Sequence, residues 1–247
     1  GIFLKKNLRR YFAHKNYKRA TAIWVVHKSL AEGCPNAEKN SQTRSGIRSF
    51  IPDLQTPISE VPTAYDSEFW KCVETKIPKT VLTVANIADH RTFKRKGIPL
   101  FLKLAESLPE FHFTIAGIDK QVLHKKELPK NVSCLGKQTK EALRQLFNKN
   151  TYYFQGSKIE GLPNVLCEAM LCECIPIGKS VFGIPDAIGT SGLIFESAEG
   201  IDHICAFLKK EPKGLGAKAR QRIKKRYPLE RRKAFFDETL NQSQKNE

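Results

Sequence analysis

The sequence predicts an α/β protein with a parallel sheet and helices on both faces of that sheet. From residue 80 onward, short apolar runs alternate with longer segments in which apolar residues recur at helical spacing. The runs are mostly apolar and rich in β-branched and aromatic residues, which is typical of strands covered on both faces. Ahead of residue 80 the same alternation is present only in part. We therefore expect one complete domain of this architecture after an incomplete one.

The amino-terminal segment is strongly basic. Residues 1–31 hold eight Lys or Arg and no Asp or Glu. They predict a basic amphipathic helix whose apolar face carries Leu4, Leu8, Tyr11 and Phe12. We expect a buried strand at 22–26, a short helix from Ser29 and an irregular loop over 34–50. A further strand is expected from Ile47 to Ile51, ending at Pro52.

Residues 52–79 are expected to form a linker, because prolines interrupt any regular structure at four positions, namely Pro52, Pro57, Pro62 and Pro78. The linker divides the chain into a partial amino-terminal domain (1–77), a main domain (78–228) and a carboxy-terminal helix (229–247). The segment before the linker is too short for an independent domain and begins without Met. We therefore expect the sequence to be part of a longer chain.

The main domain has a regular order of elements. Strands are expected at 80–85, 111–116, 132–135, 151–154, 174–177 and 192–195. Helices are expected at 97–107, at 139–147 with Thr139 as the N-cap residue, and at 229–240. Ligands of such sheets bind outside the carboxyl ends of the strands. The turn that follows the strand at 151–154 is therefore a candidate binding site.

That turn opens a stretch, residues 157–170, around which the chain is organised. Gly161 predicts a tight turn, and Pro163 suits the first position of a helix, where no hydrogen-bond donor is lost. Apolar residues then recur at helical spacing through Met170. A helix that starts directly after a strand and a glycine turn leaves its first N–H groups open. Together with the helix dipole, these groups favour a bound phosphate.

Two carboxylates lie on either side of this helix start. Glu160 precedes the helix, and Glu168 lies one turn beyond Asn164 on the same helix face. Neither carboxylate is suited to touch a diphosphate, but both can accept hydrogen bonds from paired hydroxyls of a ribose or a hexose. The pattern indicates a sugar nucleotide laid across the helix start. Two solvated glutamates at an ordinary helix start are the alternative, which the neighbouring Gly, Pro, Asn and Ala-Met residues disfavour.

Glu160 and Glu168, with Gly161, Leu162, Pro163 and Asn164 between them, resemble the E-x7-E signature of retaining glycosyltransferases of family 4. The resemblance implies the GT-B fold, in which two Rossmann-like domains face each other across a cleft. It implies that Glu168 holds the ribose, that Glu160 orients the donor sugar, and that transfer is metal-independent with retention at the anomeric carbon. No cofactor is implied beyond the donor substrate, a UDP- or GDP-sugar.

Other segments resemble further parts of this family. The family places an Arg shortly after the strand at 80–85 and a Lys before a glycine, and both hold the donor diphosphate. Lys96 matches the Lys, whereas Asn86 stands at the Arg position, so Arg91 or Arg95 is expected to compensate.

Two weaker matches and one open position complete the expected site. Gly136 and Lys137 resemble the loop that meets the nucleobase. Gly183 begins a turn near the donor sugar, with Asp186 in place of the family's Glu. The family also uses a histidine from its first domain. Because no local motif identifies either candidate, His14 or His27, that histidine remains unassigned.

Composition limits the function classes. The 247 residues have a net charge of +17 and a pI near 9.6, which favours an anionic partner. No run in the sequence reaches the ~18–20 apolar residues that span a bilayer. Seven scattered cysteines indicate reduced thiols and a cytoplasmic location, and their spacing does not indicate a metal site. Because residues 209–233 hold twelve basic and two acidic residues, we expect peripheral attachment to the anionic inner face of a membrane.

The sequence thus predicts a retaining hexosyltransferase that is represented mainly by its donor-binding domain. Its expected partners are a nucleotide-sugar donor and a glycan or glycolipid acceptor of cell-surface synthesis. Asn86 and the incomplete first domain leave open a nucleotide-sugar-binding module without activity. Charge alone also allows a nucleic-acid-binding protein, but the aromatic residues lie in apolar runs rather than in a basic groove, so we expect no nucleic-acid partner.

Overall fold

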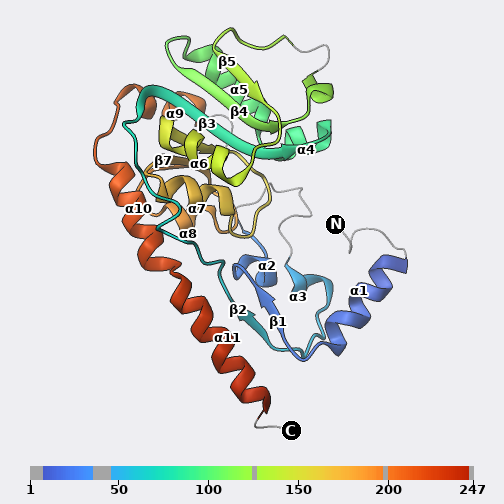
Figure 1. Cartoon of the computed structure of the whole chain (residues 1–247). Helices are drawn as coiled ribbons and strands as arrows, with labels where there is room; N and C mark the ends of the chain where they lie inside the picture. Colours follow the sequence, from blue (N-terminus) through green and yellow to red (C-terminus); the bar gives the residue numbers. More distant parts are fainter. Residues whose placement is uncertain (1–7, 36–45, 124–126, 197–199, 245–247) are drawn as a thin grey trace.

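Six parallel strands form the central sheet. The computed structural model describes residues 8–35, 46–123, 127–196 and 200–244 (Figure 1). The strands lie in the order β5-β4-β3-β6-β7-β8. Their bounds are β3 (Ile77–Ile87), β4 (His112–Ile118), β5 (Val132–Leu135), β6 (Asn150–Gln155), β7 (Ile175–Lys179) and β8 (Leu193–Phe195). Along the chain, β4 and β5 are added first on one side of β3, and β6, β7 and β8 are then added on its other side. The boundary between β3 and β6 is therefore the switch point at which such sheets bind ligands.

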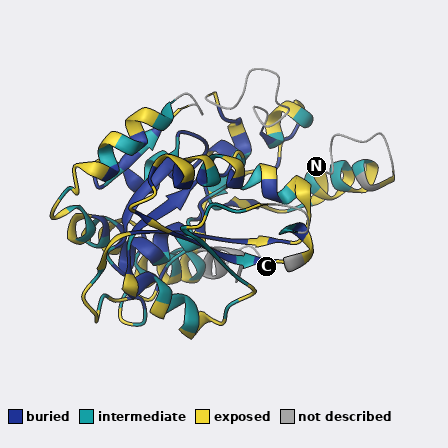
Figure 2. Cartoon of the chain, turned by 90° about the horizontal axis from the view of Figure 1, so that it is seen from above, coloured by how far each residue is buried: buried dark blue, intermediate teal, exposed yellow. Residues whose placement is uncertain are grey.

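Helices cover both faces of this sheet, as the sequence predicts. One face packs on α5 (Ile98–Ser107) and α9 (Ile201–Lys209), and the other on α6 (Lys140–Lys149), α7 (Asn164–Leu171) and α10 (Leu215–Arg226). Neighbouring residues of a strand serve opposite cores, so Val81 of β3 contributes to the first and Leu82 to the second. Figure 2 shows the buried strands between helices whose outer sides are exposed.

The predicted strands and helices of the main domain are confirmed within a few residues at their ends. The Thr139 hydroxyl accepts a hydrogen bond from the Ala142 N–H at 3.2 Å and caps α6 as expected. Helices α9 and α10 were not predicted from the sequence, and neither were three short elements, α4 (His90–Arg95), the 3₁₀ helix η3 (Lys120–Leu123) and α8 (Ile184–Ile188). The last three elements have only four to six residues each, which carry too little apolar periodicity to be recognised.

The amino-terminal part is a small parallel pair of strands, β1 (Ile23–Val25) and β2 (Ile58–Glu60), with α2 (Ser29–Glu32) and α3 (Ile47–Phe50). The predicted strand from Ile47 to Ile51 is wrong. The Ile51 N–H donates to the Ile47 carbonyl at 3.0 Å, and this helical turn buries Ile51 completely in the small core. The predicted linker was also drawn too long, because it contains β2, a three-residue strand that is only half-buried.

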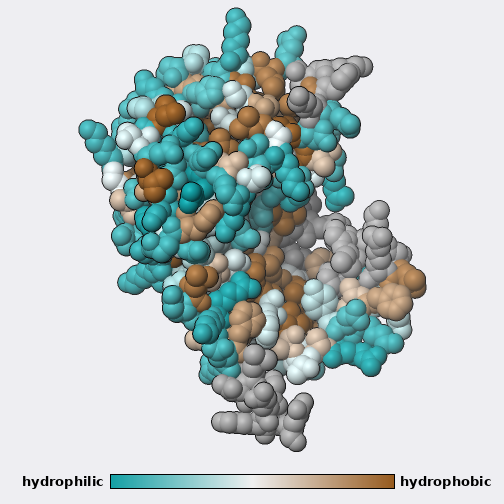
Figure 3. Space-filling view, in the orientation of Figure 1, coloured by the Kyte–Doolittle hydropathy of each residue, from teal (hydrophilic) through white to brown (hydrophobic). Residues whose placement is uncertain are grey.

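Helix α1 (Leu8–Arg19) exposes apolar side chains. Leu8, Tyr11 and Phe12 lie on one helical face and are 70%, 60% and 50% exposed. Leu4, the fourth residue of the predicted face, lies outside the described residues. In Figure 3 hydrophobic side chains gather at the end of the molecule where α1 lies, whereas the side along α10 is mostly hydrophilic. None of the helices in the described ranges combines the length and the apolar character that crossing a membrane requires.

Helix α11 (Leu229–Gln244) contacts the amino-terminal part of the chain. Its Phe235 and Phe236 rings meet the Trp24 ring of β1 edge-on, with centroids 5.6 and 5.2 Å apart. Figure 1 shows α11 running from α10 past β2 and β1. The chain thus returns to its first elements at its carboxy-terminal end. The domain limits expected from the sequence, at residues 77 and 228, remain predictions.

Candidate functional site

Two loops, one from β3 and one from β6, come together at the switch point. An added Cβ on Gly97 would lie 2.2 Å from the Gly156 carbonyl oxygen, so the two backbones touch where no side chain fits. Gly97 also has a φ of 76°, which glycine adopts without strain. Beside this contact the Lys158 N–H donates to the Arg95 carbonyl at 2.9 Å. These contacts place the residues before Gly97 against those after Gly156.

The two loops bring Lys96 and Glu160 together. The Lys96 ammonium group contacts Oε1 of Glu160, and each side chain exposes only 18% of its surface. Water screens a pair this enclosed much less than it screens a surface ion pair. The sequence predicted the two residues separately, Lys96 as a diphosphate contact and Glu160 as a sugar contact. Their direct contact places a cation beside a carboxylate at one point of the sheet edge.

Two helices begin at this point with open amino-terminal ends. Helix α7 has Pro163 at its N-cap position and α5 has Gly97 there, and neither helix receives a side-chain cap. The expectation that Pro163 would be the first helical residue is therefore wrong by one position. Its ψ of 114° is extended, and Asn164 is the first residue with helical geometry. Uncapped first amides and the helix dipole make both helix starts suited to anionic groups.

Glu168 faces the same region from α7. Burial raises the pKa of Glu168 from an ordinary 4.5 to about 7, against the opposing charge of Lys140. The buried Tyr153 of β6 lies near both carboxylates. Burial raises the pKa of the Tyr153 phenol well above its ordinary value, and the charges of Glu160 and Glu168 contribute in the same direction. The charges of both glutamates of the signature therefore act on one buried residue of β6.

The residues between the two glutamates differ in what they offer to a ligand. Leu162 and Pro163 are buried, so only their backbone groups are available. Asn164 is exposed, and its Oδ1 accepts a hydrogen bond from the Tyr65 hydroxyl at 3.1 Å. Tyr65 lies in the segment that connects β2 to β3, and the sequence did not predict that it lies near Asn164. A single tyrosine in a proline-rich segment carries no local signal of a role at the site.

The four remaining predicted residues follow the carboxyl ends of two strands, β3 and β5. Arg91 is exposed on α4, and Arg95 is half-buried with its carbonyl bonded to Lys158. Gly136 and Lys137 are exposed after β5, which is separated from the switch point by β4 and β3. Within the described residues no hydrogen bond or ion pair joins these four residues to Lys96, Glu160 or Glu168. Their roles at the diphosphate and the base remain predictions.

Gly183 is directly connected to the signature. Its N–H donates to the Gly161 carbonyl at 2.9 Å, and an added Cβ on Gly183 would lie 2.3 Å from that oxygen. The same Cβ would lie 3.1 Å from the ring of His27, one of the two histidines that the sequence left unassigned. The structure therefore brings Lys96, Glu160, Gly161, Gly183 and Glu168 into one region. It adds His27 from the amino-terminal part.

Two curated proteins are similar to this chain in sequence. The chain is 25% identical over 209 residues to the phosphatidylinositol N-acetylglucosaminyltransferase GPI3 subunit of Saccharomyces cerevisiae, a match that covers 76% of this chain and 45% of that protein. It is 28% identical over 141 residues to the gpi3 subunit of Schizosaccharomyces pombe, covering 53% and 30%. The chain thus spans less than half the length of these curated relatives.

Solved structures share the fold. Sucrose-phosphate synthase from Thermosynechococcus elongatus superposes with a TM-score of 0.75 at 15% identity, over 99% of this chain and 63% of that one. Anabaena Alr3699/HepE, in complex with UDP-glucose, superposes with a TM-score of 0.70 at 14% identity, over 98% and 70%. The main domain therefore has the α/β architecture of GT-B glycosyltransferases.

The family described as glycosyl transferases group 1 matches residues 73–226. That range runs from the segment before β3 to the end of α10 and contains Lys96, Glu160 and Glu168. It covers more than half of the 247 residues. The chain belongs to the glycosyl transferases group 1 family.

Proposed function

We propose that this chain carries the donor site of a retaining glycosyltransferase of family 4. The enzyme moves a hexose or hexosamine from a nucleoside diphosphate sugar, UDP- or GDP-linked, to an acceptor hydroxyl. The contact between Lys96 and Glu160 at the switch point is the observation that carries the proposal. In this proposal the cation serves the departing diphosphate, and the carboxylate beside it serves the sugar hydroxyls.

Each group has a definite task in this proposal. The open start of α7 and the Lys96 ammonium stabilise the negative charge that builds on the leaving diphosphate. Glu160 accepts hydrogen bonds from the donor sugar and fixes its orientation. Glu168 accepts hydrogen bonds from the ribose hydroxyls when it is ionised. The enclosure of Lys96 and Glu160 strengthens these interactions, because little water competes for them.

The GPI3 relatives favour a lipid-linked acceptor. Their name specifies phosphatidylinositol and N-acetylglucosaminyl transfer, and 76% of this chain aligns with one of them. We therefore propose a glycolipid or phospholipid-linked acceptor at the cytoplasmic face of a membrane. Because GPI3 is named as a subunit, a protein partner is also part of the proposal.

Titration calorimetry with UDP, GDP and ADP, followed by their sugar derivatives, tests the donor site. We expect binding of one nucleoside diphosphate, and tighter or equal binding of its sugar derivative. Absence of binding for every nucleotide would refute the proposal. Release of free sugar or transfer to an alcohol then separates an active enzyme from a binding module, the alternative that Asn86, exposed at the end of β3, keeps open.

We further propose that the basic surface at the junction of α10 and α11 binds an anionic membrane. A groove of ≈540 Å³ lies there, lined by Lys218, Gln221, Arg222, Lys225, Arg226 and Arg231. Its lining contains five cationic side chains and no acidic one. The exposed apolar face of α1 supplies a second, hydrophobic contact of the kind found at membrane surfaces.

Flotation with vesicles of phosphatidylcholine, with and without phosphatidylserine, tests this attachment. The triple variant Lys218→Glu, Lys225→Glu and Arg231→Glu is expected to weaken binding to the acidic vesicles at least roughly hundredfold, at about 1 kcal/mol per basic residue. The matched control carries the same charge change at exposed positions elsewhere, as Lys103→Glu, Lys130→Glu and Lys149→Glu. Equal losses in both variants would show that net charge rather than the groove is responsible.

A further inference from the structure

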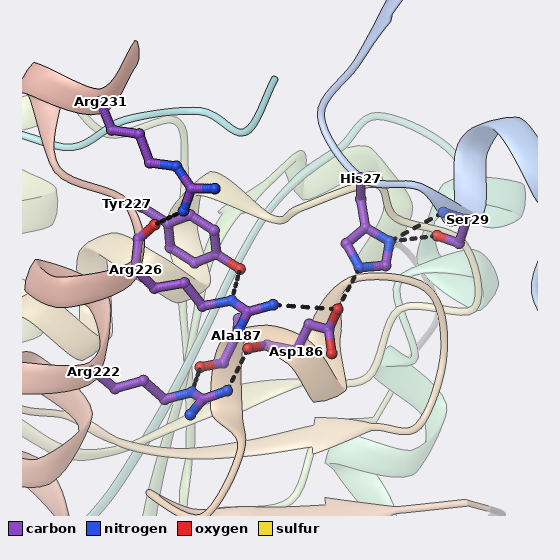
Figure 4. A network of polar contacts seen from close by, with 8 residues as sticks. All are labelled: His27, Ser29, Asp186, Ala187, Arg222, Arg226, Tyr227 and Arg231. Carbon is purple, nitrogen blue, oxygen red and sulfur yellow. Dashed lines mark hydrogen bonds and ion pairs between the residues drawn. The ribbon is translucent and has the colours of Figure 1, made fainter. Parts of the chain in front are cut away.

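Three parts of the chain meet at Asp186 of α8. Nε2 of His27, which follows β1, lies 2.9 Å from Oδ2 of Asp186. The Arg226 guanidinium of α10 lies 3.5 Å from the same oxygen. Figure 4 shows His27 and Arg226 approaching Asp186 from opposite sides. Since 159 positions separate His27 from Asp186 along the chain, this junction is purely tertiary.

The surroundings of His27 determine its tautomer. The Ser29 backbone N–H points at Nδ1 of His27 at 3.3 Å, and the Ser29 hydroxyl lies 2.7 Å from the same nitrogen. A backbone N–H can only donate, so Nδ1 is an acceptor and the ring proton resides on Nε2. His27 therefore donates its Nε2–H to Asp186. With only 4% of its surface exposed, the ring is held in that direction by the turn between β1 and α2.

Asp186 is held in its ionised form on α8. Burial by itself would raise the pKa of Asp186, but the hydrogen bond from His27 and the charges of Arg226 and Lys28 outweigh it and lower the pKa. The Arg222 guanidinium donates to the Asp186 and Ala187 carbonyls at 2.7 Å each. Helix α8 is therefore bonded to α10 through Arg222 and Arg226, and to the amino-terminal part through His27.

This junction lies against the turn of the donor site. Gly183, at the start of α8, donates to the Gly161 carbonyl, and Gly161 directly follows Glu160. The amino-terminal part touches the same turn directly. A Cβ on Gly161 would meet Val26 at 2.7 Å and Leu30 at 2.9 Å, and both residues flank His27 in the chain. A shift of the turn between β1 and α2 must therefore disturb the turn that carries Glu160.

We propose that His27 and Asp186 are positioning residues, which lock the amino-terminal part onto the Gly161–Gly183 contact and so hold Glu160 in place for the donor sugar. The role of Glu160 at the donor sugar rests on the proposed function, whereas the coupling between the two turns does not. The junction contacts described above join His27, Arg226, Asp186, Gly183 and Gly161, and none of them involves Glu168 or the loop after β5, which are proposed to meet the ribose and the base. Loss of the junction is therefore expected to affect the sugar and not the nucleotide.

Two substitutions of His27 in the full chain separate these effects. His27→Phe keeps a flat ring and removes the donor, whereas His27→Gln retains an amide N–H near the Nε2 position. Amide hydrogen exchange followed by mass spectrometry is expected to be faster in segments 156–163 and 180–188 of His27→Phe, unchanged in β4 and β5, and close to normal in His27→Gln. Calorimetry is expected to show about a tenfold loss of affinity for the UDP-sugar and none for UDP, the size of one charge-assisted hydrogen bond.

The outcomes are distinguishable. Normal exchange in both segments of His27→Phe would overturn the coupling. Faster exchange with equal losses for UDP and UDP-sugar would overturn the positioning role. If no nucleotide binds the unmodified chain, the proposed function fails, and the exchange result still decides whether the two turns are coupled. Should His27→Phe not fold, Asp186→Asn, which removes the charge but preserves the size of the side chain, is measured in its place and is expected to loosen the same two segments.

Discussion

Replacing Lys96 by methionine is expected to lower the rate of sugar transfer by about 10²–10³-fold, the loss typical of removing one preorganised charge partner of a transition state. The Lys96 ammonium contacts Glu160 inside an enclosed site, and methionine keeps most of the side-chain volume without the charge. Affinity for the nucleoside diphosphate is expected to fall by roughly tenfold as well, because one charge-assisted contact is lost. Steady-state kinetics and calorimetry measure the two effects.

The matched control for this variant is Lys94→Met. Lys94 lies on α4 two residues earlier and is exposed. It carries the same charge, so a loss confined to Lys96→Met would exclude a general effect of net charge. A double variant with Glu160→Gln then measures the coupling between the pair, because its loss is expected to be smaller than the sum of the two single losses. Full activity in Lys96→Met would remove this lysine from the site.

Glu168→Gln is expected to stabilise the protein above pH 7 and to weaken nucleotide binding. The pKa of Glu168 is raised by burial from 4.5 to about 7, so between these values the folded chain binds a proton that the unfolded chain has released. Stability therefore falls as pH rises through this window and stays low above it. Glutamine does not ionise, so the variant avoids a cost on the order of 2 kcal/mol, allowing for partial solvent screening.

Thermal melts of both proteins from pH 4 to pH 9, roughly the range that brackets the shifted pKa, measure this difference. The two curves are expected to separate as pH rises, with the variant more stable. In the unmodified chain, nucleotide affinity is expected to rise with pH while stability falls. The reason is that the ionised carboxylate accepts hydrogen bonds from the ribose hydroxyls. In the unmodified chain that affinity should fall as pH drops below about 7, and in Glu168→Gln it should be low at every pH. Glu141→Gln, exposed on α6, serves as the control, and parallel melting curves would contradict the assignment.

The sequence predicted most of the main domain because its strands are buried on both faces. A run such as Tyr152-Tyr153-Phe154 is apolar whichever face each residue serves, so it is recognisable without knowledge of its neighbours. The failures lie where this signal is absent. Residues from Ile47 to Ile51 are apolar at both ends, which suits either a strand or one helical turn, and the small core selects the turn. Strand β2 has two half-buried residues and one exposed residue, and no pattern of its own.

The candidate site, like the fold, has residues that local sequence patterns identify and residues that only the tertiary structure brings together. The spacing of Glu160 and Glu168 and the glycine before α5 are local patterns, so a resemblance to known transferases identified them. The contact between Lys96 and Glu160 spans 64 positions and depends on β6 pairing with β3. Tyr65 and His27 had no local signal, because each contacts a residue that is far away in the chain, Asn164 and Asp186 respectively.

The amino-acid sequence by itself determined where strands, turns and helix starts occur, because these depend on periodicity and on glycine and proline within a few residues. The tertiary structure alone decided which of these elements become neighbours. Its strand order places the loops after β3 and β6 side by side, and the junction at Asp186 sets the amino-terminal part against the turn that carries Glu160. Contacts of this kind arise from the packing of whole elements on shared cores, so no short stretch of sequence contains them.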